Sequence, residues 1–158
     1  MEIDQARALA HDLMTAHGLT DWSFAFDRAK RRAGAAHFAD KKITLSRAIA
    51  EAADEQVVRD TILHEIAHAL VGPEHHHDRH WREVCIRIGG SGHAQLSNAP
   101  HIPGAWIGTC PAGHTIERFR RPTRLMSCAR CNPSFSPEYQ FVWHRRKMKL
   151  SQQLGLAS

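Results

Sequence analysis

The sequence predicts an α+β protein, in which a small core of helices and strands is followed by a separate cysteine-containing module. Three observations predict this arrangement. Residues 2–88 show a helical pattern, then three short strand patterns, then two further helical patterns. Three of the four cysteines lie in the last third, and the two parts differ in charge. The length of 158 residues suits one domain with a small module attached.

The first part of the chain begins with a helical pattern and continues with short strands. Gly18 is a natural stop for the helix, and alternating aromatic residues follow it. A turn is predicted at Asp40-Lys41, and the strands together predict a small antiparallel sheet. The expected elements are a helix over residues 2–17 and strands over 22–26, 33–38 and 41–47.

A long central helix is predicted between Asp54 and Gly72. Asp54 is a favourable N-cap, and Gly72-Pro73 ends the pattern. Its apolar residues cover more than one face, so the helix is expected to be buried. Asp78 is a second N-cap and predicts a third helix. The inward residues of that third helix are Trp81, Val84, Cys85 and Ile88, with Cys85 as a core residue.

The central helix carries the sequence HExxH. His64 and His68 are four residues apart, so both imidazoles lie on one helix face and can converge on one zinc ion. Glu65 stands where it can take a proton from a metal-activated water and later deliver it to a leaving amine. A helix face with merely structural histidines is disfavoured, because buried polar groups need partners.

Catalytic zinc usually takes three protein ligands and leaves one position for water. The Gly72-Pro73 turn brings the chain back toward the helix face that bears the first two histidines. The residues alone leave the third ligand open, and one neighbouring histidine, such as His80, could instead stabilise an oxyanion. The possible third ligands are His75, His76, His77 and His80.

The segment Leu45 to Trp81 resembles the SprT-like (Spartan-type) zinc metallopeptidase family. That family has HExxH on a helix, then a short loop and a His-x-x-x-(Phe/Trp) element whose histidine is the third ligand. In this sequence His77 stands four residues before Trp81, so the resemblance implies His77. It also implies a minimal zincin-like metallopeptidase core, a C-terminal zinc ribbon, and action on DNA-associated or DNA-crosslinked proteins.

A second metal site is predicted in the last third of the chain. Soft ligands in two short knuckles suit a closed, tetrahedral structural zinc. The ribbon of the family usually has Cys-x2-Cys in both knuckles, whereas Gly113 stands here at the second position and a histidine follows it. Either that histidine completes the site or the site is incomplete. The predicted ligands are Cys110, His114, Cys128 and Cys131.

The two parts of the chain carry opposite net charges. Residues 1–98 carry −2 and residues 99–158 carry +7, which favours an anionic partner for the second part. Arginines beside Phe119 suit phosphate contact and base stacking, so DNA is the expected partner, single-stranded DNA in particular. A solvated basic hairpin is the alternative. The tentative nucleic-acid-binding residues are Arg118, Arg120, Arg121 and Arg124.

These observations predict a zinc-dependent peptidase with one catalytic and one structural zinc ion, acting on a protein substrate as a cytoplasmic monomer without membrane segments. One rival is a non-proteolytic nucleic-acid-binding or regulatory zinc protein, and another is a zinc hydrolase of small amides. The predicted organisation is a metallopeptidase domain over 1–98, a linker over 99–104 within the polar stretch 91–104, a ribbon over 105–144, and a basic tail over 145–158.

Overall fold

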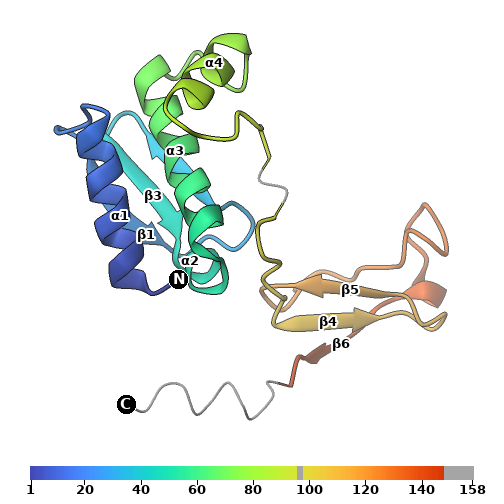
Figure 1. Cartoon of the computed structure of the whole chain (residues 1–158). Helices are drawn as coiled ribbons and strands as arrows, with labels where there is room; N and C mark the ends of the chain where they lie inside the picture. The colour runs from blue at the N-terminus through green and yellow to red at the C-terminus, as the bar shows by residue number, and fades with distance from the viewer. Residues whose placement is uncertain (96–97, 148–158) are drawn as a thin grey trace, which may run out of the picture. The chain divides into compact units, whose positions relative to one another are not determined.

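The computed structural model divides the chain into two compact units, Met1–Ile102 and a second unit that begins at Pro103 (Figure 1). It describes residues 1–95 and 98–147. Most of the predicted basic tail, residues 148–158, lies outside these described residues. No helix in the described part of the chain is long and apolar enough to cross a membrane.

The first unit has the expected order of a helix, three strands and further helices. The predicted helices and strands are confirmed, and a short additional helix, α2, follows β3 directly. Ser46 begins α2, because its hydroxyl accepts a hydrogen bond from the backbone N–H of Ile49 at 3.2 Å. The elements are α1 (Ile3–Ala16), β1 (Ser23–Asp27), β2 (Gly34–His37), β3 (Lys42–Ser46), α2 (Arg47–Ala52), α3 (Glu55–Val71) and α4 (Arg79–Arg87).

The sheet of the first unit is mixed, so the expectation of a wholly antiparallel sheet was wrong. Its strand order is β1-β3-β2. The hairpin β2–β3 is antiparallel and turns at Lys41, which has a φ of 44°. β1 pairs with β3 in parallel, because the chain reverses twice between them and β3 inserts into the middle. β2 is thereby left at one edge of the sheet.

The helix α3 forms the centre of the first unit. It packs against α1 and against β2 and β3, as Figure 1 shows, and α4 covers its C-terminal part. Ile62, Leu63 and Ile66 of α3 are wholly buried, and Ile43 and Leu45 of β3 lie beneath them in the same cluster. Burial of such side chains contributes roughly 1.5–3 kcal/mol each, so the core rests on apolar packing.

The second unit is a small antiparallel sheet of order β5-β4-β6. Gly108 in β4 has no room for a side chain, because a Cβ there would lie 2.9 Å from the ring of Trp143 on β6. The buried cluster of this unit, among its described residues, consists of Cys110, Cys128 and Phe141. The elements are β4 (Trp106–Thr109), β5 (Thr115–Arg118), a short 3-10 helix η1 (Pro137–Tyr139) and β6 (Val142–Arg145).

Candidate active site and metal centres

Three histidine side chains of the first unit converge on one point. His64 and His68 lie one turn apart on α3, and His77 reaches them from the loop between α3 and α4. The Nε2 atom of His77 lies 3.0 Å from Nε2 of His64 and 3.1 Å from Nε2 of His68. The ligand atoms of all three residues lie within 4.8 Å of one another. The structure therefore brings together the three histidines that the sequence and the resemblance indicated.

The geometry and charge of this trio fit a zinc ion. Zinc–nitrogen bonds of 2.0–2.1 Å in a tetrahedral arrangement separate two nitrogens by roughly 3.3 Å, close to the observed spacing. Hydrogen bonds among the three imidazoles explain this spacing less well than a metal ion does, because each ring nitrogen can donate at most one proton. Burial lowers the pKa of His64 and of His68 to about 4, with a smaller contribution from neighbouring histidine rings. Both imidazoles are neutral at neutral pH, the form that binds metal.

Backbone groups also contact the imidazoles of His64 and His68 on α3. His64 makes a backbone hydrogen bond with His93, and His68 makes one with His75; both raise the pKa of the imidazole, as a carbonyl acceptor does. When the Nδ1–H of an imidazole donates to a backbone carbonyl, the tautomer is fixed and Nε2 is left free to bind a metal. The stretch around His93 had been predicted as part of a polar linker, and its contribution to the site was missed.

Trp81 packs against all three histidines at once. Its ring centroid lies 4.7 Å from that of His64, 5.2 Å from that of His68 and 4.6 Å from that of His77. The side chain is only 1% exposed, and its Nε1 atom has no hydrogen-bond partner among the described residues. The helical pattern predicted that Trp81 points inward; its contact with every histidine of the trio depends on how α4 packs on α3.

Glu65 directly follows His64 on α3, and its side chain is buried against the edge strand β2. It is 6% exposed, and this burial raises the pKa of its carboxyl group to about 8, although the charge of Arg32 and a backbone hydrogen bond with Ala36 act in the opposite direction. Gly34 makes this position available, because a Cβ there would lie 2.8 Å from both Cγ and Oε1 of Glu65. From the sequence, Gly34 was placed in the strand over residues 33–38 and was not connected with Glu65.

His75 of the loop and His80 of α4 form a separate pair. His75 Nδ1 lies 2.7 Å from Oδ2 of Asp78, and the rings of His75 and His80 are 4.7 Å apart. His75, His76 and His80 do not belong to the cluster of ligand atoms found in the described residues. The geometry therefore favours His77 among the four possible third ligands.

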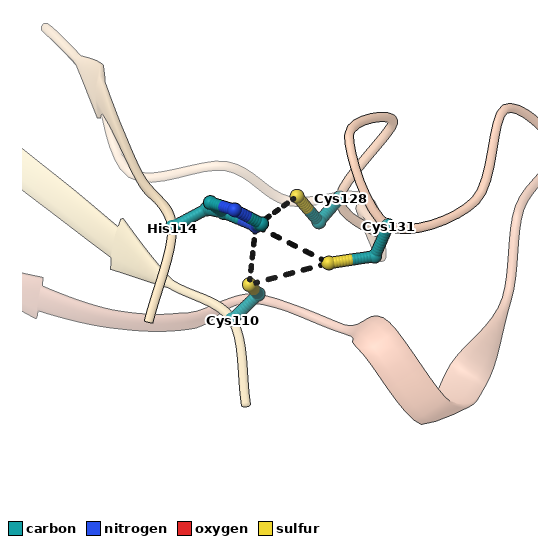
Figure 2. A group of neighbouring side chains, drawn as sticks. All are labelled: Cys110, His114, Cys128 and Cys131. Atoms are coloured by element: carbon teal, nitrogen blue, oxygen red, sulfur yellow. Dashed lines mark hydrogen bonds between the residues drawn. The ribbon is translucent and has the colours of Figure 1, made fainter. Parts of the chain in front are cut away.

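The second unit contains a cluster of three cysteines and one histidine (Figure 2). The Nδ1 atom of His114 lies 3.7 Å from Sγ of Cys110, 3.5 Å from Sγ of Cys128 and 3.2 Å from Sγ of Cys131. Cys110 and Cys131 are 3.9 Å apart at sulfur. A tetrahedral zinc ion with one nitrogen and three sulfur ligands requires separations of roughly 3.6 and 3.8 Å, so the cluster fits zinc.

Tight backbone turns shape both knuckles of this cluster. In the first, Gly113 has a φ of 81°, and its N–H donates to the carbonyl of Cys110. In the second, the N–H of Cys131 donates to the carbonyl of Cys128. Burial opposes ionisation of Cys128, but nearby backbone N–H groups hold the pKa of its thiol below the usual value. Gly113, which departs from the usual Cys-x2-Cys pattern, provides the turn that points His114 inward.

The four arginines predicted to bind nucleic acid differ in their surroundings. The Nη1 atom of Arg118 donates to the backbone carbonyl of Glu117 at 2.8 Å. The guanidinium of Arg121 lies over the ring of Trp106, 5.4 Å from its centroid. Arg120, Arg121 and Arg124 are exposed, and Arg118 is half-buried. Arg118 and Arg121 therefore have contacts within the fold, although Arg121 is exposed like Arg120 and Arg124.

Comparison with protein families agrees with the resemblance read from the sequence. Residues 5–101 match the family model described as the SprT-like family. The match covers more than half of the chain and includes the three converging histidines and Glu65. The cysteine cluster lies beyond the matched residues. No curated protein matches the chain.

Proposed function

This chain belongs to the SprT-like family, and from that membership and its site geometry we propose that it is a zinc-dependent metallopeptidase. The observation that carries the proposal is the convergence of three imidazole Nε2 atoms, with the buried Glu65 directly after His64 on α3. Three protein ligands leave a tetrahedral zinc ion one position for water or substrate, which is the arrangement of catalytic rather than structural zinc. His77 is the exposed member of the trio, and His64 and His68 are half-buried.

In this mechanism, His64, His68 and His77 hold the metal, and Glu65 handles the protons. The bound zinc would supply a Lewis acid that polarises the scissile carbonyl and lowers the pKa of water. Glu65 takes a proton from the attacking water and delivers it to the leaving amine. Without metal, burial raises the pKa of Glu65 to about 8. A nearby dication would favour the ionised form that accepts the proton.

A polypeptide is the substrate that the surroundings of Glu65 favour. β2 is an edge strand whose residues are partly exposed, and Ala36 of this strand contacts Glu65 through its backbone. An edge strand can pair with an extended peptide through main-chain hydrogen bonds. A peptide bound along β2 would bring its carbonyl groups toward the carboxyl group of Glu65.

For the second unit we propose a structural zinc ion and a role in binding nucleic acid, single-stranded DNA in particular. The four ligands leave no open coordination position, which suits a structural site. The exposed Arg120 and Arg124, together with the basic charge of residues 99–158, suit phosphate contacts. The substrates would then be proteins that are bound or crosslinked to DNA.

The test is cleavage of a DNA-bound basic protein, with and without single-stranded DNA, by wild type and by Glu65→Gln. We expect cleavage by wild type, its loss in Glu65→Gln with both zinc ions retained, and stimulation by DNA. Cleavage by Glu65→Gln would contradict the assignment of the base. Cleavage that ignores DNA would contradict the nucleic-acid role alone. DNA binding without any cleavage by the zinc-loaded protein would favour a non-proteolytic binding protein.

A further inference from the structure

Asp78, which begins α4, makes two different contacts with its two carboxylate oxygens. Oδ1 accepts a hydrogen bond from the backbone N–H of Trp81 at 2.9 Å, which is an ordinary helix N-cap. Oδ2 lies 2.7 Å from Nδ1 of His75, three residues earlier in the loop. One side chain therefore joins the last part of the loop to the first turn of the helix. His77 lies between the two contacts.

Both ends of this short segment contact the histidines of α3. The backbone of His75 is hydrogen-bonded to the ring of His68. The ring of Trp81, at the other end, packs against His64, His68 and His77 with centroids 4.6–5.2 Å apart. A contact that fixes His75 relative to Trp81 therefore also fixes the position of the His77 imidazole relative to His64 and His68.

We propose that Asp78 is a positioning residue for the metal site, whose two carboxylate oxygens hold His75 and Trp81 together and thereby place His77 opposite His64 and His68. The inference rests on the proposed function, because it assumes that the trio binds zinc. Asp78 is not a member of the histidine cluster of ligand atoms. It acts through the segment that it closes, in the way that partners outside the ligand set orient metal ligands.

The alternative is that Asp78 is no more than a helix cap, and the chain provides a matched control for it. Asp54 caps α3 with the same geometry, its Oδ1 lying 2.9 Å from the N–H of Val57. This cap is at the N-terminal end of α3, whereas His64 and His68 occupy later turns. Asp54 therefore reports the effect of an aspartate-to-serine change at a helix cap away from the histidines.

The substitutions separate capping from the contact with His75. Serine caps a helix about as well as aspartate, but its single short hydroxyl cannot reach both partners, so Asp78→Ser keeps the cap and loses the contact. Asparagine keeps a capping oxygen and a second hydrogen-bonding group, so Asp78→Asn is the conservative variant. His75→Ala removes the contact from the other side and leaves the cap of α4 intact. Asp54→Ser is the control.

The experiment is titration of the metal-free, full-length protein with Co²⁺. Cobalt bound by the cysteine cluster gives intense thiolate charge-transfer bands, whereas cobalt bound by the histidines gives only weak visible bands, so each site is observed separately. We expect Asp78→Ser and His75→Ala to weaken binding at the histidine site by about 10-fold or more. Binding at the cysteine cluster should not change, and Asp54→Ser and Asp78→Asn should bind like wild type.

The double variant Asp78→Ser/His75→Ala should be no weaker than either single variant, because both remove the same contact. Wild-type affinity in Asp78→Ser would overturn the inference, as would equal weakening in Asp54→Ser. If Asp78→Asn weakened cobalt binding as much as Asp78→Ser, the effect would come from the charge of Asp78. That result would also overturn the inference. If the histidines of wild type bind no metal, the proposed function fails and this inference fails with it.

Discussion

The two clusters of potential metal ligands are built in opposite ways. The histidine trio takes two members from one long helix and the third from a loop, and that third side chain is exposed. The Cys110–His114 and Cys128–Cys131 knuckles come from two tight turns, and two of their four members are buried. An open three-ligand site suits chemistry, and a closed four-ligand site suits structure.

The two units also differ in the composition of their buried cores. The first unit has an extensive apolar cluster that includes Ile43, Ile62 and Ile66 and does not involve the histidines. In the second unit the described buried cluster contains Cys110 and Cys128 themselves, with Phe141 as the large apolar member. A unit whose buried cluster includes its candidate metal ligands is expected to depend on metal to fold, whereas the first unit has an apolar core apart from its histidines.

The largest expected effect is the unfolding of one unit but not the other when a ligand is removed. Cys128→Ser should abolish the fold of the second unit, because structural zinc contributes about 10–16 kcal/mol of apparent binding free energy to such small modules. His68→Ala should lose its metal and keep the first unit folded. Amide chemical-shift dispersion measures both outcomes. Dispersed signals from residues 106–145 in Cys128→Ser would contradict the contrast between the units.

The second effect is a pH dependence confined to the first unit of the metal-free protein. Burial raises the pKa of Glu65 from 4.5 to about 8, so the folded state binds this proton more tightly than the unfolded state. The resulting stabilisation is complete below about pH 4.5 and is lost as the pH rises through about 8, by as much as about 5 kcal/mol.

The test is urea unfolding of the metal-free wild type and of metal-free Glu65→Gln at several pH values between about 5 and 8. The free energy of unfolding of wild type should fall relative to that of Glu65→Gln across the range. His64 and His68 titrate in both proteins, so their contributions cancel in the difference. A difference that stays constant with pH would mean that Glu65 is ionised throughout.

The smallest expected effect concerns Gly34. A Cβ at this position would lie 2.8 Å from Cγ and Oε1 of Glu65, so Gly34→Ala should displace the carboxyl group and lower cleavage by about 10- to 100-fold, with zinc retained. Gly18→Ala is the control, because Gly18 has a φ of 78° and no neighbour within 4 Å. It should lose about 1 kcal/mol of stability and keep full activity. Equal activity losses in both variants would point to a general effect on folding.

Much of the fold could be predicted because the signals are local. The helices α1, α3 and α4 follow from apolar spacing, and the N-caps Asp54 and Asp78 were both identified before the structure. The parallel pairing of β1 with β3 was not predicted, because strand order depends on long-range packing that short alternating segments do not encode. The additional helix α2 was missed because six residues carry little periodicity.

The sequence by itself determined that His64, Glu65 and His68 share one helix and that two knuckles carry three cysteines and a histidine, since helical and turn geometry act over four residues. Only the tertiary structure decided the rest. His77 meets the other two histidines because α4 packs on α3 and Trp81 lies against the trio. Gly34 meets Glu65 because β2 is the edge strand beside α3. These contacts join residues far apart in the chain, and packing alone brings such residues together.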